Sequence, residues 1–406
     1  MCREAKILLV MSALFTFAMG LSGIFVNIFF WKQTSSFIII VTYNLIHYIT
    51  TPITFIIGGI IAKVKNGVWS LRIGLLLYAI FFALLLFFGS KGVQYIYLLG
   101  VVYGFASGFY WLAYNTLTFD FTHVNNRDTF NGYNGCYSGI AAAIAPITSG
   151  YIISRFITNK GYNIVFTITL LIFLLLFCIS LMLKCNNYGS KVDYKVVFSR
   201  NSKEWSIIRK TVMIWSFRDV IIGFLVSLLI IEATNSELSL GKTTLIASLV
   251  SSGAYVLVQR IIKPPHRKRA IYIGAIGSFI AVLGIVFKVT YGTLLIFVIM
   301  DAFFLPFFII QLSSATFNVI SRGHDEGMRI EYMINKDLAI NGGRIISAVI
   351  LIALISMYNT EVTIRGYLLF ISAAPLLSGY FLTKLTEVLE GKLSKDKAIR
   401  HRKKNN

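Results

Sequence analysis

The chain has 406 residues, of which 56% are hydrophobic and 14% charged, and its formal net charge is +21. Apolar runs of about 20 residues, the length that spans a bilayer, recur from end to end and exclude a water-soluble globular fold. The pattern lacks the alternating strands of a membrane β-barrel, so the sequence predicts an all-α integral membrane protein.

Twelve transmembrane helices are predicted. In chain order they cover residues 7–30, 37–62, 71–89, 94–118, 133–154, 163–183, 211–231, 243–262, 270–287, 293–317, 338–357 and 364–384. Most Lys and Arg residues lie on the same side as the N-terminus, which the positive-inside rule assigns to the cytoplasm. We therefore expect a plasma-membrane protein with both termini in the cytoplasm. The basic charge is interpreted as a topology signal, and no nucleic-acid partner is expected.

An internal repeat relates the two halves of the chain. A shift of 200 residues aligns Phe17 with Phe217, Thr34 with Thr234 and Ser36 with Ser236, and further identical pairs follow without a gap as far as Gly92 with Gly292. The sequence thus predicts an N-terminal six-helix half (1–184), a basic cytoplasmic linker (185–210), a C-terminal six-helix half (211–384) and a basic tail (385–406). Because six is even, both halves run parallel, an arrangement that places a substrate site between them.

Two short segments resemble signatures of a transporter family. Residues 59–67 read Gly-Ile-Ile-Ala-Lys-Val-Lys-Asn-Gly, similar to the turn between helices 2 and 3 of that family but without its acidic residue. Residues 145–150 read Ala-Pro-Ile-Thr-Ser-Gly and resemble the helix-5 signature of its antiporters. Over residues 5–390 the chain resembles the major facilitator superfamily. The resemblance implies alternating access, and the second motif favours export. The helix-4 arginine of proton-coupled drug exporters is absent between Gly100 and Thr118.

Four charged residues fall within apolar spans, where insertion costs about 2.5–3.5 kcal/mol each: Arg218, Asp219, Asp301 and Arg344. Helical rise places the first two and Arg344 at equal depth. In folds of the family that the chain resembles, helices 7 and 11 are neighbours, so we expect Asp219 to pair with Arg344 while Arg218 faces the cavity. Asp301 has no evident cationic partner and is a candidate proton carrier. The alternative is that these charges only lock helices together.

Polar and aromatic residues at helical spacing predict the chemistry of the N-terminal half. They are Trp111, Tyr114 and Asn115 on one helix, and Asn44 and His47 on another. Rings and amides of this kind suit a partly apolar organic solute. For His47 a hydrogen-bonded contact between helices is favoured over a proton relay. The same interpretation applies to Asn27.

Asp120, Arg127 and Asp128 lie between the fourth and fifth predicted helices and form a candidate gating cluster, with a solvated surface as the alternative. We find no metal-ligand cluster and no phosphate-binding loop, so no metal, cofactor or enzymatic site is predicted.

The expected function is secondary active transport of a small, partly apolar organic solute by a monomer in the lipid bilayer. We expect an exporter that is coupled to protons. Two alternatives remain open, which are uptake of a sugar, peptide or other metabolite and a lipid or glycolipid flippase.

Overall fold

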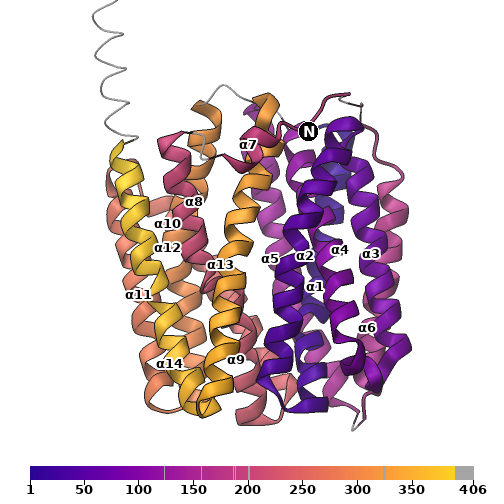
Figure 1. Ribbon diagram of the computed structural model, residues 1–406, viewed down its shortest axis with the longest axis vertical. Coiled ribbons are helices and arrows are strands. Elements are labelled where there is room, and N and C mark those ends of the chain that lie inside the picture. Colours follow the sequence, from indigo (N-terminus) through magenta and orange to yellow (C-terminus); the bar gives the residue numbers. More distant parts are fainter. Residues whose placement is uncertain are drawn as a thin grey trace, which may run out of the picture.

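The computed structural model describes residues 1–122, 124–156, 158–185, 187, 189–199, 202–322 and 326–388. Every regular element in these ranges is a helix, as the apolar runs predict (Figure 1). The first half contains α1 (Arg3–Thr34), α2 (Phe37–Val64), α3 (Gly67–Phe88), the 3-10 turn η1 (Gly89–Tyr95), α4 (Ile96–Phe121), α5 (Val124–Ser154) and α6 (Lys160–Ser180).

The second half follows a linker that contains a short helix, α7 (Tyr194–Phe198). Its helices are α8 (Lys203–Ser216), α9 (Asp219–Thr234), α10 (Glu237–Ile261), α11 (Arg267–Phe287), α12 (Tyr291–Arg322), α13 (Arg329–Met357) and α14 (Thr360–Ser372), and residues 374–388 are also helical. The short turns η2 (Pro264–His266) and η3 (Glu326–Met328) precede α11 and α13.

In the described residues, 11 helical stretches are long and apolar enough to cross a membrane. One of them, Gly67–Phe121, has 55 residues and contains both α3 and α4, which fold back on each other at η1. Counting these two separately gives the twelve predicted passes. Helices α8 and α9 make up one pass, as do α14 and residues 374–388.

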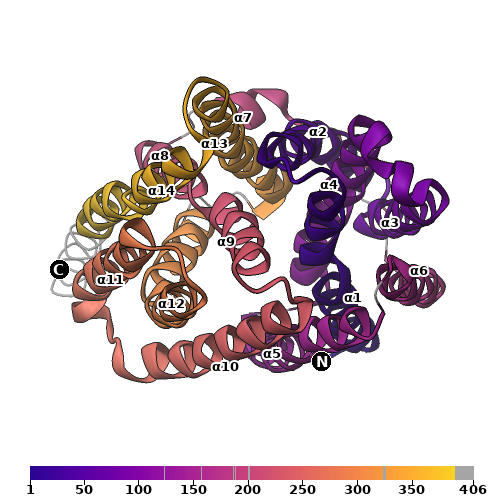
Figure 2. The same ribbon diagram turned by 90° about the horizontal axis from the view of Figure 1, so that it is seen from below.

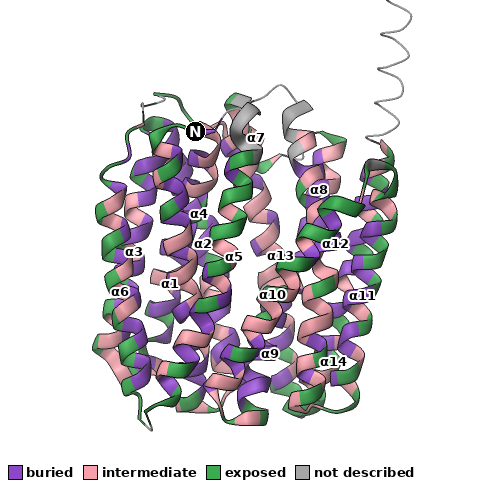
Figure 3. Cartoon of the chain, turned by 180° about the vertical axis from the view of Figure 1, so that it is seen from behind, coloured by how far each residue is buried: buried purple, intermediate pink, exposed green. Residues whose placement is uncertain are grey.

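The two halves stand side by side as two groups of helices (Figures 1 and 2). They meet along two seams, where α5 packs on α10 and α2 packs on α13. The N-terminus and the end of the last described helix lie at the same end of the bundle, which we call the terminal end; the other is the distal end (Figure 1). Buried residues gather between helices, and many exposed ones on the outside are apolar, such as Phe87 and Leu171 (Figure 3).

The internal repeat is visible at the distal turns that follow α1 and α9. Ser35 and Asn235 both adopt left-handed backbone angles, with φ of 48° and 49°. In each turn a threonine hydroxyl accepts from a backbone amide two residues on, Ser36 N at 3.4 Å from Thr34 and Ser236 N at 3.3 Å from Thr234. The aligned sequences therefore fold into the same turn.

The seventh pass differs from its prediction as one helix over 211–231. It is broken between α8 and α9 at Phe217 and Arg218, and Ser347 of α13 donates to the Phe217 carbonyl at 2.8 Å. A helix break is tolerated in a membrane where another group, such as this serine hydroxyl, satisfies the freed backbone group. The eleventh pass begins at Arg329 rather than 338. The twelfth has a break at Ala373, two residues before Pro375, which has no amide hydrogen to continue the helix.

Candidate functional site

An ion pair at mid-depth joins Arg344 of α13 to Asp219, the first residue of α9. This is the predicted pairing, and the structure confirms it. The side chains are 19% and 36% exposed, so the pair borders an open space rather than the packed interior of the C-terminal half. The Arg344 guanidinium lies 5.7 Å from the ring of Tyr48 on α2, which brings the charge against the N-terminal half.

Arg218 and Asp301 form a second ion pair, between the helix break and α12. Two expectations are therefore wrong, since Asp301 does have a cationic partner and Arg218 does not face a cavity. The Arg218 side chain is only 2% exposed and lies 5.8 Å from the ring of Trp215. The neighbouring residues 218 and 219 thus reach partners on different helices, α12 and α13.

The Asp219–Arg344 pair continues along α13 through residues that the sequence reasoning missed. Asn341 donates to the Asp337 carboxylate at 2.9 Å and accepts from Arg344 at 3.5 Å. The three side chains of α13 follow one another at spacings of four and three residues and so share one face. Asp337 was missed because the predicted helix began at 338. A search for acidic residues one helical turn before that start would have found it.

A cavity of about 280 Å³ lies between the halves. Four helices line it, with Met19, Gly23, Ile24 and Asn27 from α1, Tyr43, Asn44 and His47 from α2, Tyr103 from α4, and Gly223 and Phe224 from α9. The predicted Asn44 and His47 are thus brought together. The ring of His47 stands edge-on to Tyr103, with centroids 4.7 Å apart, and lies 5.1 Å from Tyr48. The cavity and the Arg344 pair are therefore neighbours.

The predicted residues of α4 lie in a different place. Trp111 packs edge-on against Tyr114 and Phe15, and the Tyr114 hydroxyl accepts from Ser12 of α1 at 3.3 Å. Trp111 is 43% exposed and Asn115 is half-buried, and none of the three predicted residues lines the cavity. Trp111 and Tyr114 form an aromatic cluster with Phe15 between α1 and α4.

At the terminal end, two ion pairs link the halves. Lys63 of α2 reaches Glu331 of α13 at 2.9 Å, and Asp120 of α4 pairs with Arg329. Lys63 also donates to the Gly327 carbonyl at 2.7 Å. Asp120 is one of the predicted gating residues, whereas the side chains of Arg127 and Asp128 lie outside the described part of the chain.

Hydrogen bonds also attach the linker to α13 at the terminal end. The fully buried Asn335 of α13 donates to the carbonyls of Val197 at 2.6 Å and Ser199 at 3.0 Å, and accepts from Trp205 at 2.9 Å. Glu331 accepts from the backbone of Asp193 at 3.2 Å. The linker therefore closes over the terminal ends of α2 and α13.

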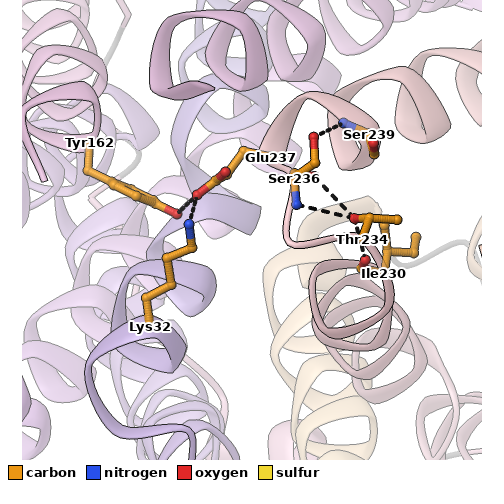
Figure 4. Close-up of polar contacts among 7 residues, drawn as sticks. All are labelled: Lys32, Tyr162, Ile230, Thr234, Ser236, Glu237 and Ser239. Carbon is orange, nitrogen blue, oxygen red and sulfur yellow. Dashed lines mark hydrogen bonds and ion pairs between the residues drawn. The ribbon is translucent and has the colours of Figure 1, made fainter. Parts of the chain in front are cut away.

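At the distal end, a third ion pair joins the halves (Figure 4). Glu237, the first residue of α10, accepts from Lys32 of α1 and from the hydroxyl of Tyr162 of α6 at 2.8 Å. The Glu237 side chain is 7% exposed, so it is almost fully withdrawn from solvent. Ion pairs between the halves are therefore formed at both ends of the bundle.

The antiporter-like segment 145–150 lies in the seam between α5 and α10. A side chain added to Gly150 would meet the Glu237 carbonyl at 2.5 Å, and one added to Gly241 would meet the Pro146 carbonyl at 2.7 Å. A side chain added to Gly20 of α1 would likewise meet the Ala145 side chain at 2.8 Å. Small residues on facing helices let the backbones touch, as at other membrane helix contacts.

A family model described as "Major Facilitator Superfamily" matches residues 8–327. The curated protein "Uncharacterized protein YqgE" of Bacillus subtilis (strain 168) is 34% identical over 378 residues, which are 92% of this chain and 88% of that protein. A Geobacillus stearothermophilus protein, "Uncharacterized protein in sodM 3'region", is 42% identical over 40% of this chain and 77% of its own length.

Solved transporter structures share the fold at low sequence identity. A point mutant of the nucleoside transporter NupG aligns with a TM-score of 0.70 and 13% identity, over 94% of this chain and 100% of that one. The peptide transporter POT in complex with sulfate aligns with a TM-score of 0.69 and 14% identity, over 95% of this chain and 94% of that one. A bacterial homologue of the iron transporter ferroportin in its outward-facing state aligns with a TM-score of 0.66 and 16% identity, over 95% of this chain and 100% of that one.

Proposed function

Because this chain belongs to the major facilitator superfamily and is a membrane transporter, we propose that it exports a small, partly apolar organic solute in exchange for protons. We place the terminal end in the cytoplasm and the distal end outside, and the protein in the plasma membrane as a monomer. The observation that carries the proposal is the Asp219–Arg344 pair, which borders the space between the halves.

The pair supplies a means of coupling. A carboxylate that holds an arginine at the membrane midplane can accept a proton, and the neutral acid then releases the cation to other partners. Arg344 already contacts Tyr48 of the opposite half, so a change at Asp219 alters a contact across the transport path. Protonation and substrate binding would thus act on the same contact between the halves.

The ion pairs at the two ends supply the gates. Alternating access requires the halves to separate at one end while they stay joined at the other. The pair Lys32–Glu237 would open to face outward, whereas Lys63–Glu331 and Asp120–Arg329 would open to face inward. Each gate then joins a residue of one half to a residue of the other.

The direction of transport is proposed from segment 145–150. It resembles the helix-5 signature of antiporters, and its small residues and proline meet Gly20, Glu237 and Gly241 at the α5 seam. Uptake of a metabolite is the alternative within the same fold. Iron is the less favoured cargo, because within the described residues no three His, Cys, Asp or Glu side chains come together as a metal site.

The test is transport by the purified protein in liposomes that contain a pH-sensitive dye. Gradients of ethidium, uridine and dialanine, imposed in either orientation, represent an aromatic cation, an uncharged ring compound and a dipeptide. We expect a gradient of a ring compound, ethidium or uridine, to drive proton movement in the opposite direction, and Asp219→Asn to reduce that flux at least tenfold while the protein still folds and reconstitutes.

Glu387→Gln is the control for this experiment. Glu387 lies in the last described helix, its side chain is 60% exposed, and it belongs to neither the Asp219–Arg344 pair nor the proposed gates. It should transport at the wild-type rate. Normal proton-coupled flux in Asp219→Asn would contradict the proposed coupling, and proton movement in the same direction as the solute would favour uptake.

A further inference from the structure

Two asparagines in the wall of the cavity hold each other in a fixed orientation. The Asn44 side-chain nitrogen donates to the Asn27 side-chain oxygen at 2.9 Å and to the Ile40 carbonyl at 2.8 Å. The atom that faces a carbonyl must be the nitrogen, so the orientation of the Asn44 amide is determined. The atom of Asn27 that receives the other bond must then be its oxygen.

This arrangement leaves one donor and one acceptor unused. Both hydrogens of Asn44 Nδ2 are engaged, whereas Asn44 Oδ1 and Asn27 Nδ2 have no hydrogen-bond partner among the described residues. Asn27 of α1 and Asn44 of α2 are hydrogen-bonded to each other, and both residues line the cavity. The two hydrogen-bonded asparagines in the cavity wall therefore offer one free donor and one free acceptor.

A third polar group in the wall lacks a partner. The hydroxyl of Tyr43 is buried without a hydrogen bond to any described residue, although the side chain is only 3% exposed. Leaving such a group unpaired costs free energy, so a ligand that reached it would gain a hydrogen bond. Tyr43 lines the cavity beside Asn44.

The remaining wall is made of rings. Tyr43 and Tyr103 have centroids 6.2 Å apart, Tyr103 meets His47 edge-on, and Phe224 of α9 contributes from the opposite half. Within about 280 Å³, these faces suit a flat ring system. No Asp, Glu, Lys or Arg is among the lining residues.

We propose that the cavity binds a planar, uncharged ring compound that carries a hydrogen-bond donor next to an acceptor, as in a cyclic amide. The ligand N–H would donate to Asn44 Oδ1, and its carbonyl would accept from Asn27 Nδ2. The inference rests on the proposed transport function and names the substrate class of the same cavity. Phe224 makes the ligand bridge the two halves.

The test compares two probes that differ by one donor, 2-quinolinone and N-methyl-2-quinolinone. Calorimetric titration of the purified protein should show at least tenfold weaker binding of the methylated compound, because a site built for a hydrogen bond rejects an analogue without it. Equal affinities for the two probes, or no binding of either, would overturn the inference.

Asn27→Asp is the informative variant, since it keeps the oxygen that Asn44 needs and replaces the free donor by an acceptor. It should lose 2-quinolinone binding at least tenfold. Asn163→Asp on the exposed face of α6 makes the same chemical change away from the cavity and should bind normally. Wild-type affinity in Asn27→Asp would also overturn the inference.

Transport is measured separately with the same proteins. Proton-coupled flux of ethidium without discrimination between the quinolinones would leave the proposed function standing and overturn the substrate class. Selective binding of 2-quinolinone with no flux of any solute would support the binding site and contradict the proposed transport mechanism.

Discussion

At the scale of single residues, the two arginine–aspartate pairs of the C-terminal half differ in their exposure. Arg218 and Asp301 are 2% and 14% exposed, whereas Arg344 and Asp219 are 19% and 36% exposed. A buried pair that is broken leaves an uncompensated charge, while an accessible one exchanges partners at a lower cost. We therefore interpret the first pair as structural and the second as the transport pair.

Arg218→Gln should destabilise the protein by about 3–5 kcal/mol, because it leaves Asp301 as an unpaired charge among apolar helices. Thermal unfolding of the purified protein in detergent measures this change. The double variant Arg218→Gln with Asp301→Asn should recover most of the stability, since it removes both charges. A single variant as stable as the wild type would show that Asp301 does not depend on Arg218.

At the scale of elements, the seventh pass carries both charges at the break between α8 and α9. A continuous helix over 211–231, as the hydropathy predicts, would hold residues 218 and 219 about 100° apart on one axis. The break frees the Phe217 carbonyl, and the buried Ser347 satisfies it. The Tyr367 hydroxyl donates to the Ser347 carbonyl at 2.6 Å and also lies 2.5 Å from the Ser347 hydroxyl.

Ser347→Ala should lower the free energy of unfolding by about 1–3 kcal/mol, because the Phe217 carbonyl would be left without a donor in a dry environment. Ser356→Ala removes a hydroxyl from an exposed position of the same helix and serves as the matched control. Equal melting temperatures for the two variants would mean that the break is stabilised by other contacts.

At the scale of the whole molecule, ion pairs hold the two halves together at both ends. The distal latch is Lys32–Glu237 with Tyr162, and the terminal latch combines Lys63–Glu331 with the linker bonds of Asn335. Removing one latch shifts the conformational equilibrium toward the state in which that end is open.

A cysteine at Ile24 in the cavity reports this shift, after Cys2, Cys136, Cys178 and Cys185 have been replaced. Glu237→Gln should increase labelling of that cysteine by a membrane-impermeant maleimide added outside cells. Glu331→Gln should decrease it, because the terminal end then opens more often. The same labelling rate in both variants would contradict a gating role for these pairs.

The sequence by itself determined the twelve passes, the parallel halves and the depth of the intramembrane charges. Hydropathy and charge placement are properties of each segment by itself. The bilayer acts on each segment separately, because inserting one charged side chain costs several kcal/mol. The pairing of Asp219 with Arg344 also followed, since equal depth on helices that are neighbours in the resembled family leaves few other partners.

The partner of Arg218, the latches and the cavity were decided only by the tertiary structure. The Arg218–Asp301 contact joins α12 to a helix break that hydropathy does not reveal, and Lys32–Glu237 joins residues more than two hundred positions apart. The cavity depends on how α1, α2, α4 and α9 are rotated about their axes. Helix rotation in a membrane is set by packing between neighbours, which an apolar sequence specifies only weakly because most of its faces are equally apolar.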